Sequence, residues 1–403
     1  MSRLYLYDDA KAREFEPFAL TRPVSELRAG AEIIRLRWER AAGTSAYGFI
    51  GAPHLTSFDE PDAPSAVADD STITAGSLIA NSRFVVSLAA RLDGRVSVFS
   101  CEGAICAVRL QASIDIGGLM NGSVSLEDLA SSDAKPTEIS GRWLREVWDL
   151  IGQLGDQLKD DLPVMGPELS GGAIVNATTI GKHAVYCETG ARIEPFAILD
   201  ATDGPIVIRR GATIAAFTRI VGPTYIGEDS HIVGDAVRAC SIGNVCKVRG
   251  EISSSVMLGH SNKGHTGFVG SSYIGRWVNL GAGTTTSNLK NTYGPVQIQT
   301  SRGLRDSGLQ FLGSMIGDHA KTGIGTMLTT GCLIGAGANI YGAKISPKRI
   351  PPFAWGDCEP YARFEIAKFV EVAQRMMARR HVSLSERGRK LLEEAYRQSG
   401  DPE

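Results

Sequence analysis

Residues 208–232, IRRGATIAAFTRIVGPTYIGEDSHI, carry isoleucine at every sixth position. The same spacing returns in residues 316–340, IGDHAKTGIGTMLTTGCLIGAGANI, where the repeated position holds Ile, Thr, Leu, Ile and Ile. A period of six matches neither the 3.6-residue period of a helix nor the alternation of one long strand. It is typical of a solenoid in which each hexad forms a short strand and a tight turn, so that the repeated residues stack inward as ladders.

The composition narrows the class of protein. The chain has 403 residues, of which 42 are basic and 44 acidic, with a formal charge of -2. This balance gives no global reason to expect binding to nucleic acid or to an anionic membrane. Seven cysteines without a CxxC pair predict buried free thiols rather than disulfides or a zinc site. The charged N-terminus and the absence of a long apolar run predict neither a signal peptide nor a membrane span, so we expect a cytoplasmic protein.

Residues 1–160 are predicted to form an α/β domain. Residues 4–7, LYLY, have the pattern of a short strand, and residues 24–40 and 143–158 have helical spacing. Residues 161–172 contain Pro163, Pro167 and two adjacent glycines, which predicts a linker.

The repeat is predicted to occupy residues 173–345 and to end before Pro347 and the proline pair at 351 and 352. Residues 346–403 then form a tail with two predicted helices, at 361–380 and 385–398. We expect this tail to cover the last coil, because an open strand edge would otherwise pair with other strands. The predicted apolar stripe of the first tail helix consists of Phe364, Ala367, Phe369, Val372 and Met376.

Residues 265–288, HTGFVGSSYIGRWVNLGAGTTTSN, resemble the acetyltransferase half of the bifunctional N-acetylglucosamine-1-phosphate uridyltransferase and glucosamine-1-phosphate acetyltransferase family. Four further segments resemble a divergent bacterial branch described as sugar nucleotidyltransferases: LYDDAKAREFEPFALTRPVSELRAG at 6–30, NLGAGTTTSNLKNTYG at 279–294, IGDHAKTGIGTML at 316–328 and MMARR at 376–380. The resemblance implies a reduced nucleotidyltransferase-like α/β domain followed by a left-handed parallel β-helix. It also implies a homotrimer whose sites lie between neighbouring β-helices.

The same resemblance implies acetyl transfer from acetyl-CoA to a hexosamine 1-phosphate. Such a transfer requires a base for the amine proton, hydrogen-bond donors for the oxyanion and a fixed position for the sugar. His265 occupies the position of the family's general base, and His260 is its local competitor. No cysteine stands in a Cys/His arrangement, so we expect direct transfer without an acyl-enzyme.

Further residues are implied as substrate contacts. Asn279 and Asn288 align with family residues that hold the amino sugar. Lys290 and, as an alternative, Arg249 are candidates for the substrate phosphate, and Lys321 lies near the expected coenzyme edge. The other interpretation makes the asparagines members of an asparagine ladder or left-handed turn residues, and Lys321 a solvated surface lysine.

Two positions depart from the family pattern. Phe268 stands where the family has tyrosine, and Ser253 stands in a serine run where the family has lysine. Each change removes one polar contact to substrate. The acceptor can therefore differ from glucosamine 1-phosphate.

The loop after the first predicted strand lacks the glycines with which sugar nucleotidyltransferases hold nucleotide phosphates. Asp8 and Asp9 are candidates for holding Mg²⁺, because hard cations prefer carboxylate oxygens. The candidates for nucleotide binding are Arg13, Thr21, Arg22, Asn81 and Arg83. In the alternative interpretation, the two aspartates end a strand and Arg22 makes a structural ion pair.

Three functions therefore remain open from the sequence. The first is acetyl transfer in the β-helix, accompanied or not by nucleotidyl transfer in the N-terminal domain. The second is sugar-1-phosphate nucleotidyl transfer alone, with the β-helix as a trimeric scaffold. The third is a non-catalytic sugar-nucleotide-binding protein. In each case the partners are small sugar phosphates and nucleotides.

Overall fold

A computed structural model describes residues 3–342 and 344–400. Residues 1–2, 343 and 401–403, which the predicted domains and tail include, lie outside the described residues. Residues 3–147 with 384–399 form one compact unit, and residues 148–383 form a second. Among the described residues no helix is long and apolar enough to cross a membrane.

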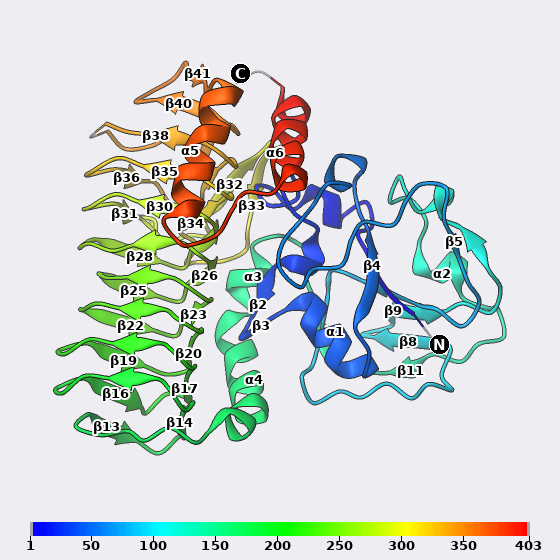
Figure 1. Ribbon diagram of the computed structural model, residues 1–403, viewed down its shortest axis with the longest axis horizontal. Coiled ribbons are helices and arrows are strands. Elements are labelled where there is room, and N and C mark those ends of the chain that lie inside the picture. The colour runs from blue at the N-terminus through cyan, green and yellow to red at the C-terminus, as the bar shows by residue number, and fades with distance from the viewer. Residues whose placement is uncertain (1–2, 343, 401–403) are drawn as a thin grey trace. The chain divides into compact units, whose positions relative to one another are not determined.

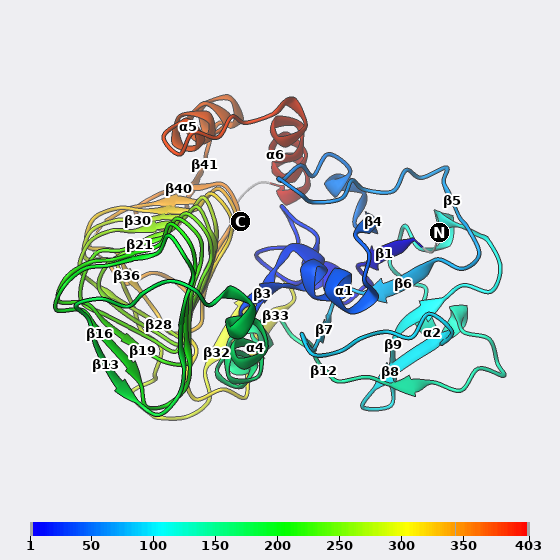
Figure 2. The ribbon, with the colours of Figure 1, turned by 60° about the horizontal axis from the view of Figure 1, so that its bottom comes forward.

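The N-terminal unit is built on a six-stranded mixed sheet (Figure 2). In spatial order its strands are β11 (Thr137–Glu138), β8 (Val98–Cys101), β9 (Ala104–Arg109), β6 (Leu78–Asn81), β1 (Leu4–Tyr7) and β4 (Ala46–Ile50). β1 runs parallel to both of its neighbours, and β9 runs antiparallel to β6 and β8. All four residues of β1 are buried, as expected for a central strand covered on both faces.

Smaller elements surround this sheet. The predicted helix over residues 24–40 begins only at Ile34, because a 3-10 turn and a hairpin closed by Gly30 at φ +60° precede it. Its buried Trp38 donates from Nε1 to the carbonyl oxygen of Phe84. These elements are η1 (Ala12–Glu14), η2 (Val24–Glu26), β2 (Arg28–Ala29), β3 (Glu32–Ile33), α1 (Ile34–Ala42), η3 (Pro53–Leu55), β5 (Thr72–Ile73), β7 (Phe84–Val86), β10 (Ile114–Asp115), η4 (Ile116–Gly118), α2 (Leu126–Leu129) and β12 (Gly141–Trp143).

The second unit is a β-solenoid whose coils stack along one axis (Figure 1). It has three faces, and each face is a sheet of mainly parallel strands. The first face contains β13 (Thr178–Gly181), β16 (Ile198–Ala201), β19 (Arg219–Val221), β22 (Ala236–Arg238), β25 (Glu251–Ser253) and β28 (Phe268–Gly270). The second face contains β14 (Val185–Cys187), β17 (Ile206–Ile208), β20 (Thr224–Ile226), β23 (Ser241–Ile242), β26 (Val256–Gly259), β29 (Tyr273–Arg276), β34 (Ser314–Ile316), β37 (Cys332–Ile334) and β39 (Arg349–Ile350).

The third face, named here the polar-row face, contains β15 (Arg192–Ile193), β18 (Thr213–Ile214), β21 (His231–Ile232), β24 (Lys247–Val248), β27 (Asn262–Lys263), β30 (Asn279–Leu280), β35 (Lys321–Thr322), β38 (Asn339–Ile340), β40 (Ala354–Gly356) and β41 (Ala362–Arg363). Its outward positions form a polar row that includes His231, Lys247, Asn262, Asn279, Lys321 and Asn339. The solenoid confirms the architecture predicted from the hexads.

The six-residue spacing of aliphatic residues is lost between residues 232 and 316, although the coils continue. On the second face Ile208 pairs with Ile226, whereas Ile226 pairs with Ile242 and Ile242 with Met257. Those coils are shorter than the regular eighteen residues, so a strict six-residue count fails there. A projecting hairpin of β32 (Gln297–Thr300) and β33 (Gly303–Asp306) then separates β31 (Thr285–Thr286) from β36 (Met327–Leu328), although β31 and β36 pair in parallel.

The predicted linker over 161–172 is largely helical. Helix α4 (Leu154–Leu169) follows α3 (Asp149–Gly152) and includes Pro163 and Pro167. Both prolines are on its exposed side, where water can satisfy the carbonyls that lose their partners. The opposite side is buried on the solenoid, where Gly166 lies so close to Tyr186 that a Cβ would be 2.2 Å from its ring.

The repeat extends beyond the predicted end at 345, because β39 and β40 continue two of the faces. β41, which lies within the predicted tail, then pairs antiparallel with β40. This strand of the tail, rather than one of its helices, occupies the sheet edge. The first tail helix is α5 (Ile366–Ala378), and its buried residues are Phe369, Val370, Ala373 and Met377, so Val372 and Met376 of the predicted stripe lie on its flank. The second, α6 (Glu386–Ser399), belongs to the N-terminal unit, where Ser385 Oγ donates to Asp59.

Candidate functional site

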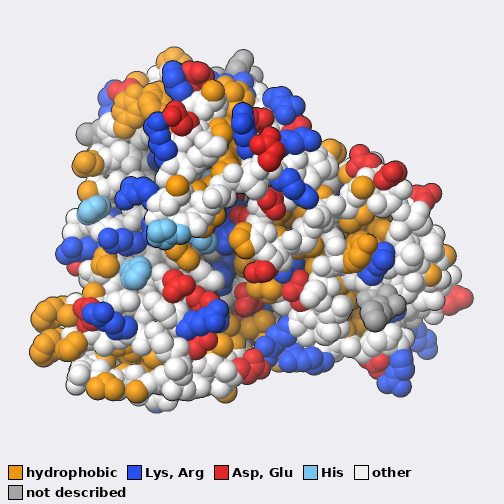
Figure 3. All heavy atoms as spheres, in the orientation of Figure 1, with side chains coloured by type: hydrophobic (Ala, Val, Ile, Leu, Met, Phe, Trp, Pro, Cys, Tyr) orange, Lys and Arg blue, Asp and Glu red, His pale blue; other side chains and the backbone are white. Residues whose placement is uncertain are grey.

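His265 lies in the corner turn between β27 and β28, and its side chain is exposed. It lines a cavity of about 320 Å³ on the polar-row face, which we call the His265 cavity. The lining residues are Lys247, His260, Asn262, Gly264, His265, Val278, Asn279, Met376, Arg379 and Arg380. The structure therefore brings the predicted base together with one predicted sugar contact, Asn279. Figure 3 shows histidine side chains beside Lys and Arg side chains on the solenoid surface in view.

Asn279 is held in place by the coil below it. Asn262 Nδ2 donates to Asn279 Oδ1 at 2.7 Å, and the two residues are register partners in adjacent strands. This is the asparagine ladder of the alternative interpretation. The two interpretations are compatible, because the hydrogen bond fixes the orientation of the Asn279 amide while that residue still lines the cavity.

His260 occupies a corner position with φ +54°, and its ring lies 4.4 Å from that of Trp277. Trp277 occupies the same corner in the next coil and His319 in the coil after it. The ring of His319 is 6.3 Å from that of Trp277 and 6.0 Å from that of Phe369 of α5. His260 is thus one of a row of stacked corner rings. His265 instead projects from a turn, and its ring makes no hydrogen bond within the described part of the chain.

Lys263 is a buried lysine inside the solenoid, only 1% exposed, in an inward row otherwise occupied here by Ile232, Val248 and Leu280. Its Nζ donates to the carbonyl oxygens of His265 and, at 2.8 Å, of Thr266. Burial lowers the pKa of Lys263 to about 8, while the charge of Asp235 acts in the opposite direction. The lysine thus ties down the turn that presents His265. Its inward position does not follow from the sequence, because the irregular coil lengths break the six-residue spacing there.

The other predicted sugar contact, Asn288, lies in a different cavity of about 540 Å³, together with Arg238, Ser253 and Ser271. Asn288 Nδ2 donates to Ser271 Oγ at 3.3 Å. The ring of Phe268 lies over Gly270 and beside that amide, since a Cβ on Gly270 would be 2.4 Å from the ring and 2.6 Å from Asn288 Nδ2. The two positions that depart from the family pattern, 253 and 268, therefore lie near Asn288 rather than in the His265 cavity.

The remaining predicted cations of the solenoid line neither cavity. Lys290 donates to the carbonyl oxygen of Pro295 at 2.9 Å, and Arg249 Nε pairs with Asp235 at 3.5 Å. Lys321 is the register partner of Asn279, but its Nζ donates to the carbonyl oxygen of His319 at 2.9 Å. Burial lowers the pKa of Lys321 to about 8. Lys321 is thus not the solvated lysine of the alternative interpretation.

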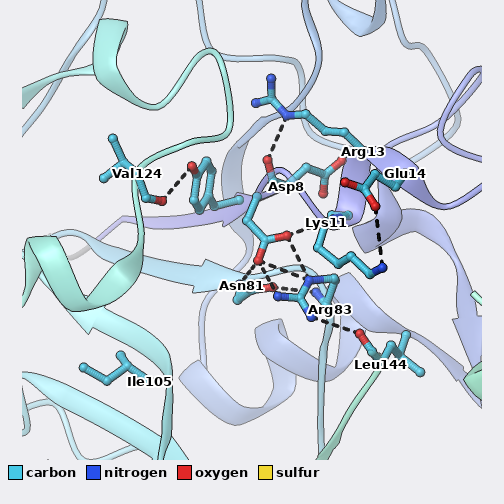
Figure 4. A network of polar contacts seen from close by, with 12 residues as sticks. Asp8, Lys11, Arg13, Glu14, Asn81, Arg83, Ile105, Val124 and Leu144 are labelled. Carbon is cyan, nitrogen blue, oxygen red and sulfur yellow. Dashed lines mark hydrogen bonds and ion pairs between the residues drawn. The ribbon is translucent and has the colours of Figure 1, made fainter. Parts of the chain in front are cut away.

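In the N-terminal unit, Asn81 and Arg83 line a cavity of about 350 Å³ at the carboxyl ends of β1 and β6, together with Trp143 and Arg145. Parallel strands commonly place ligands at this edge. Arg83 Nε donates to Asp9 Oδ1 at 2.8 Å, and Asn81 Nδ2 donates to Asp9 Oδ2 at 2.9 Å (Figure 4).

The other predicted nucleotide contacts are engaged in the fold. Arg13 donates to the carbonyl oxygen of Asp8 (Figure 4). It also donates to the carbonyl oxygens of Met120 and Leu119, and so holds the loop after η4 in place. Arg22 is 2% exposed and pairs with Glu60 at 2.8 Å, as the alternative interpretation expected. Thr21 is buried and donates to the carbonyl oxygen of Phe18 at 3.4 Å. None of these three lines the 350 Å³ cavity.

Asp8 and Asp9 do not fit a magnesium site. Both oxygens of Asp9 accept hydrogen bonds, from Arg83, Asn81 and the Ala12 backbone. Asp8 is buried, one of its oxygens accepts from the Val24 amide at 3.1 Å, and burial raises its pKa to about 6. Within residues 3–342 and 344–400, no cluster of three or more His, Cys, Asp or Glu is arranged to hold a metal ion.

Comparison with known proteins agrees with this two-unit architecture. Residues 4–167 match the model of the sugar nucleotidyl transferase family. GlmU proteins from Azoarcus sp. and Methanococcus vannielii are 25% and 28% identical over 234 and 223 residues, which cover 58% and 54% of this chain and 41% and 49% of the relatives. The chain is thus similar to GlmU proteins over rather more than half of its length.

A bifunctional sugar-1-phosphate nucleotidylyltransferase/acetyltransferase from Sulfurisphaera tokodaii is 38% identical to this chain over 91 residues, 23% of each protein. This chain spans about half or less of the length of these three relatives. The matching family model describes sugar nucleotidyl transferases, and the Sulfurisphaera relative is named as a nucleotidylyltransferase and acetyltransferase for sugar 1-phosphates.

Proposed function

We propose that the solenoid transfers an acetyl group from acetyl-CoA to the amine of a hexosamine 1-phosphate, with His265 as general base. The observation that carries this proposal is the shared cavity of His265 and Asn279. His265 is exposed and its ring has no hydrogen-bond partner within the described residues, so it is available to accept a proton. The amide of Asn279 is already oriented by Asn262 at 2.7 Å.

In the proposed reaction, the amine nitrogen attacks the thioester carbonyl while the imidazole of His265 takes the amine proton. A C–N bond forms, the C–S bond breaks, and the coenzyme leaves as a thiolate that is then protonated. General-base catalysis of this kind contributes about 10²- to 10⁴-fold. Six of the seven cysteines are buried and the seventh, Cys358, lies outside the His265 cavity, which supports direct transfer.

We include a homotrimer in the proposal. The resemblance implies that assembly, and the His265 cavity lies on one face of a single solenoid, where a second solenoid would help to enclose a sugar and a coenzyme. Sedimentation of the full chain tests the assembly directly.

Replacement of His265 by alanine tests the reaction. We expect CoA release from acetyl-CoA and glucosamine 1-phosphate, or another hexosamine 1-phosphate, to fall by about 100-fold or more. Because His265 is exposed, the melting temperature should stay close to that of the wild type. His231→Ala is the matched control, since His231 is an exposed histidine on the polar-row face in an earlier coil and lies outside the His265 cavity. His260→Ala is the competitor, and unchanged turnover in His265→Ala with loss in His260→Ala would transfer the role to His260.

A second candidate is nucleotidyl transfer in the N-terminal unit. The family match over 4–167 and the cavity beside Asn81 and Arg83 favour it. Pyrophosphate release from UTP or dTTP with a sugar 1-phosphate and Mg²⁺ should then be lost in Arg83→Gln and retained in His265→Ala. If the wild type showed neither CoA release nor pyrophosphate release, the non-catalytic sugar-nucleotide-binding function would be the remaining hypothesis.

A further inference from the structure

Three cations line the His265 cavity in addition to the residues already discussed. They are Lys247 on β24 and Arg379 and Arg380, which directly follow α5. No Asp or Glu is among the ten lining residues. Across the described residues, none of the three cations forms an ion pair. Unpaired positive charges gathered around one cavity attract anions.

The position of the two arginines is fixed by the packing of α5. Phe369 of α5 is 1% exposed, and its ring centre lies 5.0 Å from that of Phe353 and 5.7 Å from that of Phe364. Gly337 allows this approach, since a Cβ there would be 2.5 Å from Phe353 and 3.0 Å from Phe369. Figure 1 shows α5 lying along the coils from the level of β40 toward that of β30. The helix thus carries its C-terminal arginines back to the coil of His265.

Arginines near a helix C-terminus are also favoured by the helix dipole. The helix dipole does not explain the presence of Lys247 at the cavity, because Lys247 lies on a strand. It also does not explain why no Asp or Glu lines the cavity. The other charged residues of α5 behave differently, because Lys368 pairs with Glu365 at 2.7 Å and Arg375 pairs with Glu371. By contrast, Lys247, Arg379 and Arg380 have no carboxylate partner among the described residues.

We propose that Lys247, Arg379 and Arg380 bind a phosphate group of a substrate of the His265 cavity. This inference rests on the proposed acetyl transfer for the identity of the substrate, but not for the presence of an anion site. Arginine suits the role because its planar guanidinium can donate two parallel hydrogen bonds to a phosphate. The phosphate belongs either to the sugar phosphate or to the 3′-phosphoadenosine diphosphate part of the coenzyme.

The first experiment measures anion binding without any turnover. Thermal unfolding of the full chain is followed with inorganic pyrophosphate as the probe, in the wild type, in Arg379→Gln/Arg380→Gln and in Lys247→Gln. Arg375→Gln is the matched control, because Arg375 lies on the same helix outside the cavity and is paired with Glu371. We expect pyrophosphate to raise the melting temperature of the wild type and of Arg375→Gln, and to have a smaller effect on the other two variants. Equal effects in all four proteins, or no effect on the wild type, would overturn the proposal.

The second experiment identifies the source of the phosphate by acetyl-transfer kinetics. If the sugar phosphate is bound, the arginine double variant should raise the KM for hexosamine 1-phosphate by about 10-fold or more. If the coenzyme is bound, the KM for acetyl-CoA should rise instead, and acetyl-dephospho-CoA should be less affected. A double variant with both KM values equal to those of Arg375→Gln would refute the site. Pyrophosphate binding without any wild-type turnover would keep the anion site and reject the acetyl transfer.

Discussion

Lys263 Nζ donates a hydrogen bond of 2.8 Å to the carbonyl oxygen of Thr266, from inside the solenoid to the turn that presents His265. Gly267 makes room for this contact, because a Cβ there would be 3.0 Å from Lys263 Nζ and 2.3 Å from the carbonyl oxygen of Thr284. A charged side chain thus replaces an aliphatic one at a single inward position, next to the candidate base.

Lys263→Met should change how stability depends on pH. Burial lowers the pKa of Lys263 to about 8 in the folded chain, against an ordinary value of 10.5. Between these values the unfolded state binds more protons, so the wild type gains stability as the pH rises. Relative to Lys263→Met, its free energy of unfolding should increase by about 2 kcal/mol between about pH 7.5 and about pH 9.5. Urea unfolding at both pH values measures this, and a pH-independent difference would show that the folded amine titrates normally.

Asp8→Asn tests the opposite case. Burial raises the pKa of Asp8 to about 6, above its ordinary value of 3.8. The folded state then binds more protons between these values, so the wild type loses stability as the pH rises through that range. We expect a loss of about 2 kcal/mol relative to Asp8→Asn between about pH 4.5 and about pH 7. Chemical unfolding of both proteins measures this difference. A larger loss of stability in Asp8→Asn than in the wild type as the pH rises would contradict a buried Asp8 carboxyl with a raised pKa.

Gly166→Ala should disturb the packing of α4 on the solenoid. The new methyl group would be 2.2 Å from the Tyr186 ring, which must then move. We expect a destabilisation of about 1–3 kcal/mol in urea unfolding. Gly155→Ala on the same helix is the control, since a Cβ there has no atom within 4 Å. That control should be neutral or stabilised by up to about 1 kcal/mol, and similar losses in both variants would indicate a backbone effect.

Asn262→Ala should reduce acetyl transfer without unfolding the chain. It removes the 2.7 Å hydrogen bond that orients Asn279, and a small loss of alignment can lower turnover substantially. We expect kcat/KM to fall by about 10-fold, with a melting temperature near that of the wild type. Asn339→Ala, two coils beyond Asn279 on the same outward row, is the control. Equal kinetics in the two variants would make the Asn262–Asn279 contact purely structural.

Part of the candidate site followed from residue types and spacing, and part did not. The resemblance over residues 265–288 directed attention to His265 and Asn279, and the structure places both in one cavity. It also grouped Asn288 with them, although Asn288 lines the second cavity and not the His265 cavity. Residues close in sequence lie on different faces of a coil, whereas residues 15 to 18 apart become neighbours. Lys247 and Arg380 meet only because α5 folds back over the coils.

The spacing of the aliphatic residues is enough to predict the solenoid, since a strict six-residue period can bury them in no other regular structure. The sequence also indicated the short buried first strand of the N-terminal unit. Tertiary structure decided the rest. Proline signals at 163, 167 and 347 predicted breaks, but burial of one side of α4 and continued strand pairing after Pro347 outweighed them. The cations of the His265 cavity, too, depend on long-range packing of Phe369 against Phe353, which no local pattern encodes.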